Sequence, residues 1–359
     1  MKRRIGPFTV NPIGYGAMPL SHGYGPVLDD AASERLLHHV LDTGYDFIDT
    51  AAIYGLGHNE TLIGRALKAR WSEFVLASKC GWGPDRVPDG RPAVTLATLE
   101  DSLRRLETDH IDLYYLHRYD PRVPIEETVG ALARAKESGK IGAIGLSEVS
   151  ADLLRRAHAA HPIAAVQSEY SLWTRNPEIA VLAACRELGT GFVAFSPVGR
   201  GFLAGAVKPG HRYAPGDMRE TMPRFSEPHI GPNLDLSARF AKMASERGAS
   251  PAQLALAWLL HKDDALVAIP GTTSLAHADE NMAALELQLD ADIMAALDEL
   301  VNERTVSGGR YGEAMQKAVQ TERFASEGAD LPRHSGCEPA TGTARFGGHR
   351  CARSLGQPP

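Results

Sequence analysis

Short apolar runs recur along the chain, and each is followed by a stretch whose apolar positions have helical spacing. The runs are almost continuously apolar, which is typical of parallel strands that are covered on both faces. Gly, Pro or Asp residues separate the segments. The eight predicted strands span residues 13–17, 45–49, 74–80, 111–117, 141–147, 164–168, 191–196 and 266–269.

Helical periodicity follows every predicted strand. The longest stretch is expected to form two helices, because Pro251 interrupts the hydrogen bonds of a helix interior. The predicted helices span residues 33–42, 60–69, 96–106, 125–138, 150–161, 177–188, 234–262 and 275–285. Eight strand–helix units favour an α/β fold, a (β/α)8 TIM barrel. A doubly wound sheet is the alternative, but it usually has fewer strands and an early G-x-G-x-x-G loop, and the early glycines here lack that spacing.

Two regions depart from this rhythm. Residues 208–232 are rich in Pro, Gly and charge, and predict a long loop after the seventh strand that is functional or mobile. Residues 321–359 lose apolar periodicity and gain Arg, Gly and Pro, which predicts an irregular or disordered tail. The chain is therefore expected to consist of a barrel over residues 1–320 and this tail.

Composition adds mainly exclusions. The 359 residues are 43% hydrophobic and 23% charged, as in ordinary globular proteins, and the length permits either two domains or one barrel. The net charge of −6 and the absence of a basic stretch before residue 306 argue against nucleic acid as a partner. No 18-residue apolar run or signal-peptide pattern occurs, so we expect a cytoplasmic protein without a membrane partner. The oligomeric state is not indicated.

The cysteines predict neither a metal site nor a disulfide framework, because Cys80, Cys185, Cys337 and Cys351 lack C-x-x-C or zinc-ligand spacing. A reactive Cys80 beside Lys79 is one interpretation. Inert packing at the end of an apolar strand is the more common situation.

Polar residues end several predicted strands, where barrels of this type build active sites. Asp49, Lys79 and His117 end three consecutive strands, and Tyr54 lies just beyond Asp49. Each has an ordinary explanation on its own, such as a turn cap, a surface amine or a satisfied core histidine. Together they favour a functional cluster, because burying Asp49 and Lys79 separately would be far more costly than burying them as a pair.

This cluster predicts carbonyl reduction. A free tyrosine has a pKa near ~10, and the ammonium group of Lys79 is expected to lower the pKa of Tyr54. Asp49 would hold Lys79 in its charged form, while His117 would donate to a substrate oxygen or relay its proton. The phenol would then give a proton to a carbonyl oxygen, provided that a hydride carrier binds nearby.

Two late segments have the composition of a site for such a carrier. "SPVGRGFLAG" (196–205) follows the seventh strand, and its glycines allow the backbone to approach an anion closely. "IPGTTSLAHADEN" (269–281) follows the eighth strand and opens a helix, whose N-terminus favours phosphate. Small residues are also ordinary helix caps, but phosphate sites after strands seven and eight are common in barrels.

From about residue 13 to 311 the chain resembles the aldo-keto reductases. The resemblance runs through "GYDFIDTAAIYGLGHNETLIGRAL", "ASKCG", "IDLYYLHR", "GKIGAIGLSEVS", "QSEYSLW", "FSPVGRGFLAG" and "IPGTTS", and "IGLSEVS" indicates one branch of that family. It implies a (β/α)8 barrel that reduces aldehydes or ketones with a nicotinamide cofactor, usually NADPH. The family's catalytic tetrad falls on Asp49, Tyr54, Lys79 and His117.

The resemblance also implies the cofactor contacts. Ser147, Glu148 and Gln167 correspond to contacts with the nicotinamide carboxamide, and Phe195 corresponds to the residue that stacks on the nicotinamide ring. The contacts with the rest of the cofactor fall on Ser196, Pro197, Gly199, Gly201, Leu203, Gly205, Pro270, Gly271, Thr272, Thr273, Ser274, His277 and Asn281.

Three positions depart from the family pattern. Glu148 replaces the usual Asn and can accept from an amide group but cannot donate to its carbonyl. Ser274 and His277 stand where many members have Lys or Arg beside the adenosine 2′-phosphate. We therefore expect a preference for NADPH that is weaker than usual, with NADH use left open.

Two functions are open: a reductase of small aldehydes or ketones with Tyr54 as general acid, or a cofactor-sensing accessory module with little turnover. The complete tetrad favours the enzyme. Tyr24, Trp82 and Trp173 would suit an aromatic or apolar aldehyde, although they equally suit core or rim positions, and no charged anchor for a substrate is evident.

Overall fold

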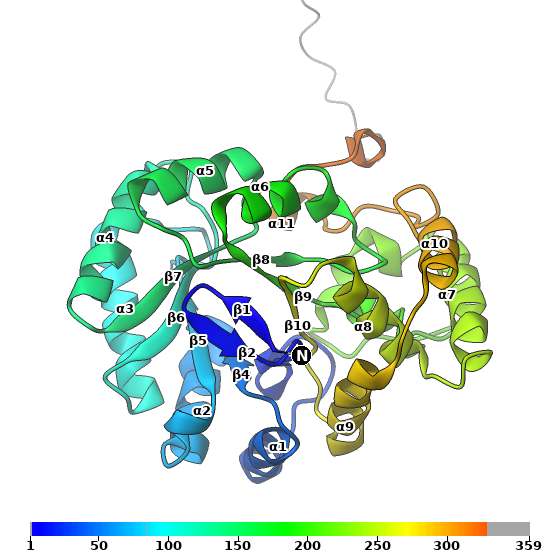
Figure 1. The fold of residues 1–359 in the computed structure, drawn as a ribbon, viewed down its shortest axis with the longest axis horizontal. Coiled ribbons are helices and arrows are strands. Elements are labelled where there is room, and N and C mark those ends of the chain that lie inside the picture. Colours follow the sequence, from blue (N-terminus) through cyan, green and yellow to red (C-terminus); the bar gives the residue numbers. More distant parts are fainter. Residues whose placement is uncertain (1, 84, 329–359) are drawn as a thin grey trace, which may run out of the picture.

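The computed structural model, which describes residues 2–83 and 85–328, shows an eight-stranded parallel barrel surrounded by helices (Figure 1). The strand order is β10-β9-β8-β7-β6-β5-β4-β3. Hydrogen bonds from Gly14 N to Ala268 O and from Ala268 N to Pro12 O, both 2.8 Å, join the residues just before β3 to β10 and close the barrel. The predicted (β/α)8 TIM barrel is confirmed.

All eight predicted strands are present, although the first two are shorter than predicted. They are β3 Tyr15–Gly16, β4 Phe47–Asp49, β5 Val75–Cys80, β6 Ile111–Leu116, β7 Ile141–Ser147, β8 Ala165–Glu169, β9 Gly191–Phe195 and β10 Leu266–Ile269.

A helix follows each of the eight strands at nearly the predicted position. The break in the longest predicted helix lies before Pro251, where Ser250 and Gln253 form a reciprocal capping box. Two α-helices were not predicted, because they lie outside the strand–helix alternation: Ala291–Leu300, capped by Asp290, and the short helix Glu313–Gln316. The α-helices are α1 Asp30–Asp42, α2 His58–Leu67, α3 Pro92–Leu106, α4 Ile125–Glu137, α5 Ala151–Ala160, α6 Val181–Leu188, α7 Ile230–Ser245, α8 Pro251–Lys262, α9 Leu275–Ala283, α10 Ala291–Leu300 and α11 Glu313–Gln316.

An N-terminal hairpin, also not predicted, closes one end of the barrel. Its strands β1 (Arg3–Ile5) and β2 (Phe8–Val10) pair antiparallel. Ile5 and Val10 are fully buried and pack with the inward-facing side chains of the barrel strands. The turn residue Gly6 lies against Ala164, just before β8 begins, so the hairpin covers the N-terminal ends of the strands. The carboxyl ends therefore lie at the opposite end of the barrel.

The segment 208–232 lies over this opposite end and makes defined contacts. Within it, Asp217 and Arg219 form a largely buried ion pair of 2.6 Å. The backbone N–H of Met218 donates to Gly23 O at 3.1 Å, which joins the segment to the loop after β3. The predicted long loop is confirmed, with two short 3-10 turns at Met218–Thr221 and Pro223–Phe225.

Contacts with the barrel continue slightly past residue 320. Glu322 Oε1 accepts from Ala151 N at the start of α5 at 2.7 Å. The rest of the predicted tail, with Cys337 and Cys351, lies outside the described residues, and the predicted boundary at residue 320 stays a prediction. Among the helices of residues 2–83 and 85–328, none is long and apolar enough to cross a membrane.

Candidate active site

The four residues of the predicted tetrad meet at the carboxyl ends of β4, β5 and β6. Lys79 Nζ donates to Asp49 Oδ1 at 2.5 Å, to Thr50 O at 2.7 Å and to Tyr54 Oη at 3.3 Å. Asp49 and Lys79 are almost completely buried, and Tyr54 is half-buried. The ring of His117 meets that of Tyr54 edge-on, with centroids 5.8 Å apart. The structure thus joins an acid, an amine, a phenol and an imidazole in one contact group.

Local sequence explains how Tyr54 reaches this position. Gly55, Leu56 and Gly57 all have left-handed backbones, with φ of 57°, 54° and 95°, which turn the chain sharply between β4 and α2. Thr50 Oγ1 donates to Asn59 Oδ1 at 2.6 Å and thereby ties the start of this loop to α2. The loop is held at both ends, so the phenol has a fixed place beside Lys79.

The ionisation of Tyr54 differs from the sequence-based expectation, whereas that of Lys79 agrees with it. Burial raises the pKa of Tyr54, and the nearby ammonium group of Lys79 offsets this only in part. The expected net lowering of the Tyr54 pKa is therefore wrong, because burial outweighs the charge. Burial opposes the charged form of Lys79, but Asp49 and Tyr54 outweigh it and raise the Lys79 pKa. At neutral pH the phenol is protonated and the amine is charged.

His117 is a neutral imidazole at physiological pH. Burial and then the charges of Arg118 and Lys79 hold its pKa well below the ordinary value. Its Nδ1 is buried and has no hydrogen-bond partner among the described residues. A neutral ring can donate a hydrogen bond, which favours that role over proton relay.

Gln167 in β8 holds the carboxylate of Asp49 from across the barrel. Its Nε2 donates to Asp49 Oδ2 at 2.7 Å, and it is 2% exposed. Ser147, at the end of β7, is equally buried and accepts from Arg118 at 3.3 Å. Two of the three predicted carboxamide contacts, Ser147 and Gln167, therefore lie beside the tetrad, and Gln167 also orients Asp49.

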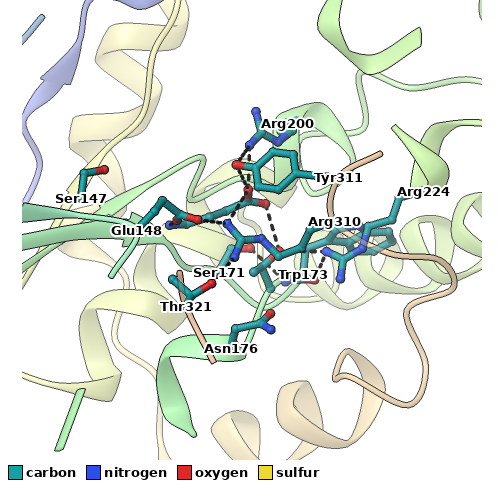
Figure 2. Close-up of polar contacts among 12 residues, drawn as sticks. Ser147, Glu148, Ser171, Trp173, Asn176, Arg200, Arg224, Arg310, Tyr311 and Thr321 are labelled. Atoms are coloured by element: carbon teal, nitrogen blue, oxygen red, sulfur yellow. Dashed lines mark hydrogen bonds and ion pairs between the residues drawn. The ribbon is translucent and has the colours of Figure 1, made fainter. Parts of the chain in front are cut away.

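The side chain of Glu148 has two partners of its own (Figure 2). Oε2 pairs with Arg310 Nη2 at 2.8 Å, and Oε1 accepts from the backbone N–H of Glu169 at 2.8 Å. Glu148 also has a left-handed backbone with φ of 55°, uncommon for a residue with a side chain. The carboxylate of Glu148 is thus already held by Arg310 and by the backbone of Glu169.

The ion pair of Glu148 belongs to a larger buried network that the sequence did not indicate. Glu169 Oε2 accepts from Arg200 at 2.6 Å, from Tyr311 Oη at 3.1 Å and from Arg310 at 3.4 Å. These residues come from the end of β8, the turn after β9 and the C-terminal segment. Glu169 is the last residue of β8, the strand that also contains Gln167. Its place at a strand end was the one feature of the sequence that could have identified it as a site residue.

The predicted phosphate segments have the backbone that their glycines suggest. Gly199, Gly201 and Gly205 have positive φ values of 60°, 102° and 64°. A Cβ on Gly271 would lie 2.7 Å from Gly16 O, so no larger residue fits there. Ser274 Oγ caps α9 by accepting from the N–H of His277. Both segments follow β9 and β10, next to each other in the barrel.

A dinucleotide fits this donor set. The first turn of α9 offers the backbone N–H groups of Leu275 and Ala276, which suit phosphate. In the glycine turn, the N–H groups of Gly199, Gly201 and Gly205 donate to backbone oxygens of the turn itself, so the glycines contribute close backbone approach and not free donors. Phe195 and Ser196 are half-buried at the end of β9, whereas Leu203 is fully buried and has only its backbone to offer. The remaining predicted positions lie in these same two segments: Pro197, Pro270, Thr272, Thr273 and Asn281.

Comparison with known proteins decides the family. The sequence profile of the aldo/keto reductase family matches residues 12–302. The chain belongs to the aldo/keto reductase family. Its assignment to a branch on "IGLSEVS" stays a prediction.

Members of the aldo/keto reductase family are similar to the chain over most of its length. A probable aldo-keto reductase 1 of Glycine max is 41% identical over 85% of this chain and 89% of its own length. The NADP(+) aldo-keto reductase yakc of Schizosaccharomyces pombe is 40% identical over 86% of this chain and 94% of its own length. The structure of glycerol dehydrogenase from Gluconobacter oxydans matches with a TM-score of 0.76 and 28% identity, over 83% of this chain and 94% of that chain.

Two further side chains can now be placed in this aldo/keto reductase. Trp173 is 3% exposed and stacks on Phe202 with centroids 4.7 Å apart, so it belongs to the core and not to a substrate site. Cys80 is 2% exposed, and burial raises the pKa of its thiol to about 12, so it is an inert packing residue. In residues 2–83 and 85–328, no group of three or more potential ligands could hold a metal ion.

Proposed function

We propose that the protein reduces aldehydes or ketones to alcohols with NADPH and that Tyr54 donates the proton. The hydrogen-bonded chain from Asp49 through Lys79 to Tyr54 carries this proposal. The relative from Schizosaccharomyces pombe, whose name includes NADP(+), and the similarity to a glycerol dehydrogenase support it. A protein that only binds the cofactor has no need for a buried charged pair beside a phenol.

The hydride is the contribution of the bound cofactor. Phe195 offers an aromatic face at the end of β9 for the nicotinamide ring. Ser147 and Gln167 lie beside the tetrad, where they can hold the carboxamide. The backbone N–H groups in the first turn of α9 can hold a phosphate, and the glycines after β9 let the pyrophosphate approach the backbone closely.

Proton transfer follows from the ionisation states. The raised pKa of Tyr54 keeps its hydroxyl protonated and available to a carbonyl oxygen. After the proton has left, the phenolate lies beside the ammonium group of Lys79, which stabilises it. Asp49 holds that ammonium group in place. Neutral His117 donates a hydrogen bond to the carbonyl oxygen of the substrate. Solvent returns a proton to Tyr54.

The test is Tyr54→Phe with 4-nitrobenzaldehyde as substrate. We expect kcat/KM to fall by about 10²- to 10⁴-fold, the usual contribution of a general acid, while the Kd for NADPH stays near the wild-type value. Tyr213→Phe is the matched control, because its hydroxyl donates only to the backbone oxygen of Phe225 on the long loop. Undiminished reduction by Tyr54→Phe would refute the role of the phenol. No NADPH oxidation by the wild type with any aldehyde would favour a cofactor-sensing module.

We also propose a cytoplasmic location. Cys80 and Cys185 are free and buried in the structure, as is usual for proteins of a reducing compartment.

A further inference from the structure

Arg118 is a buried cation at the edge of the tetrad. It follows His117 directly after β6 and is 7% exposed. Its Nη1 donates to the backbone oxygen of His117 at 2.6 Å and to Ser147 Oγ at 3.3 Å. Its Cζ lies 6.0 Å from the ring centroid of Trp82. All three of these neighbours are uncharged.

No carboxylate pairs with Arg118 in the part of the chain that the structure describes. The nearest acid in sequence, Asp120, pairs instead with Arg122 at 2.8 Å. The Nε of Arg118 is buried, and no described residue forms a hydrogen bond with it. The buried Arg200 and Arg310 differ in this respect, because Glu169 and Glu148 neutralise them.

A buried guanidinium without a counter-ion is costly, and neutral oxygens compensate it only in part. Within the tetrad the single carboxylate, that of Asp49, is already engaged by Lys79 and Gln167. The centre therefore carries one positive charge that no residue of the described ranges 2–83 and 85–328 balances. An anion bound there would balance it.

We propose that Arg118 binds a carboxylate of the substrate, so that the enzyme prefers aldehydes and ketones that also carry a carboxylate group. This inference rests on the proposed reductase function and specifies its substrate class. Arg supplies the planar, paired donors that match a carboxylate. The sequence alone showed no charged anchor for a substrate, because Arg118 looks like any arginine in a loop.

The position of Arg118 indicates the substrate and not the cofactor as the source of the anion. The predicted phosphate segments follow β9 and β10, and strands β7 and β8 separate them from β6 in the barrel. Trp82, in contrast, lies beside both Arg118 and His117, with the centroids of the indole and imidazole rings 6.1 Å apart. A substrate lying against Trp82 can place its carbonyl near Tyr54 and His117 and its carboxylate near Arg118.

The experiment compares matched acids and amides. Wild type, Arg118→Gln and Arg118→Lys are assayed with 4-carboxybenzaldehyde and succinic semialdehyde, each beside its neutral primary amide. We expect the wild type to prefer the acids and Arg118→Gln to lose about 10- to 100-fold more kcat/KM for the acids than for the amides, mainly through KM, as for a charge-assisted hydrogen bond. Arg118→Lys should keep part of the preference. Arg122→Gln, a mostly exposed cation on the same loop, should leave the acid-to-amide ratio at the wild-type value.

A binding measurement separates this inference from the reductase proposal. Calorimetry with 4-(hydroxymethyl)benzoate should give a higher Kd in Arg118→Gln, with no matching change for 4-(hydroxymethyl)benzamide. An equal loss for acids and amides, or a wild type that favours neither, would show that Arg118 only positions Ser147 and would overturn the inference. If the wild type reduced no aldehyde, including 4-nitrobenzaldehyde, the reductase proposal would fail, and the calorimetry would still decide whether Arg118 binds carboxylates.

Discussion

Replacing Arg310 by methionine should destabilise the barrel strongly. Methionine keeps much of the length of the side chain and removes its charge, leaving Glu148 Oε2 without its 2.8 Å partner and Glu169 without a 3.4 Å contact. Arg310 and both carboxylates are at most 4% exposed, so water cannot replace the lost donor without rearrangement. Removing one partner of a buried ion pair typically costs about 3–5 kcal/mol. We expect a loss of that size in the free energy of unfolding.

Urea unfolding followed by tryptophan fluorescence measures this loss. A destabilisation of that size should lower the transition midpoint by roughly 1 M urea or more, given the usual dependence of unfolding free energy on urea. The matched control is Arg156→Met, which removes an arginine from an exposed pair with Glu126, where we expect little or no change. The double variant Glu148→Gln with Arg310→Met should recover part of the loss, because no charge is then left unpaired at position 148.

The reasoning would be refuted by an Arg310→Met protein as stable as the Arg156→Met control. That result would mean that the carboxylate of Glu148 finds other partners or water at little cost. A double variant no more stable than Arg310→Met alone would show that the effect comes from lost packing and not from an unpaired carboxylate.

Two further predictions concern pH and the cofactor. Burial alone would raise the pKa of Glu169, but Arg200, Arg310 and Arg224 outweigh it and hold this pKa well below the ordinary value. Its contribution to stability is therefore present above the unfolded-state pKa of about 4.3 and is lost as pH falls below it. Urea unfolding from pH 6 to 3 should show a decline in the free energy of unfolding that is smaller in Glu169→Gln than in the wild type. Equal declines in the two proteins would contradict this prediction. At α9, Ser274 caps the helix and His277 is exposed. Because neither position holds a Lys or Arg, NADPH should bind more tightly than NADH by only a modest factor, and Ser274→Arg should increase this factor. Tryptophan quenching gives both Kd values, and tighter binding of NADH would contradict the prediction.

The sequence by itself determined the fold and the tetrad. Strand–helix alternation is a local property, written in the spacing of apolar positions, and closure into a barrel follows from the number of units. Asp49, Lys79 and His117 were identified because carboxyl strand ends converge in any such barrel. The N-terminal hairpin, α10 and α11 were not predicted, because none of them belongs to the alternation.

Only the tertiary structure decided which charges have partners. Glu148 and Arg310 are 162 positions apart, and no local pattern relates them. Arg118 is the opposite case. Only the folded barrel shows that, among the described residues, its neighbours are uncharged and include no carboxylate. The direction of the Tyr54 pKa also depended on burial, which the presence of Lys79 in the sequence does not reveal. Pairing and burial depend on distances across the barrel, whereas periodicity depends on neighbours along the chain.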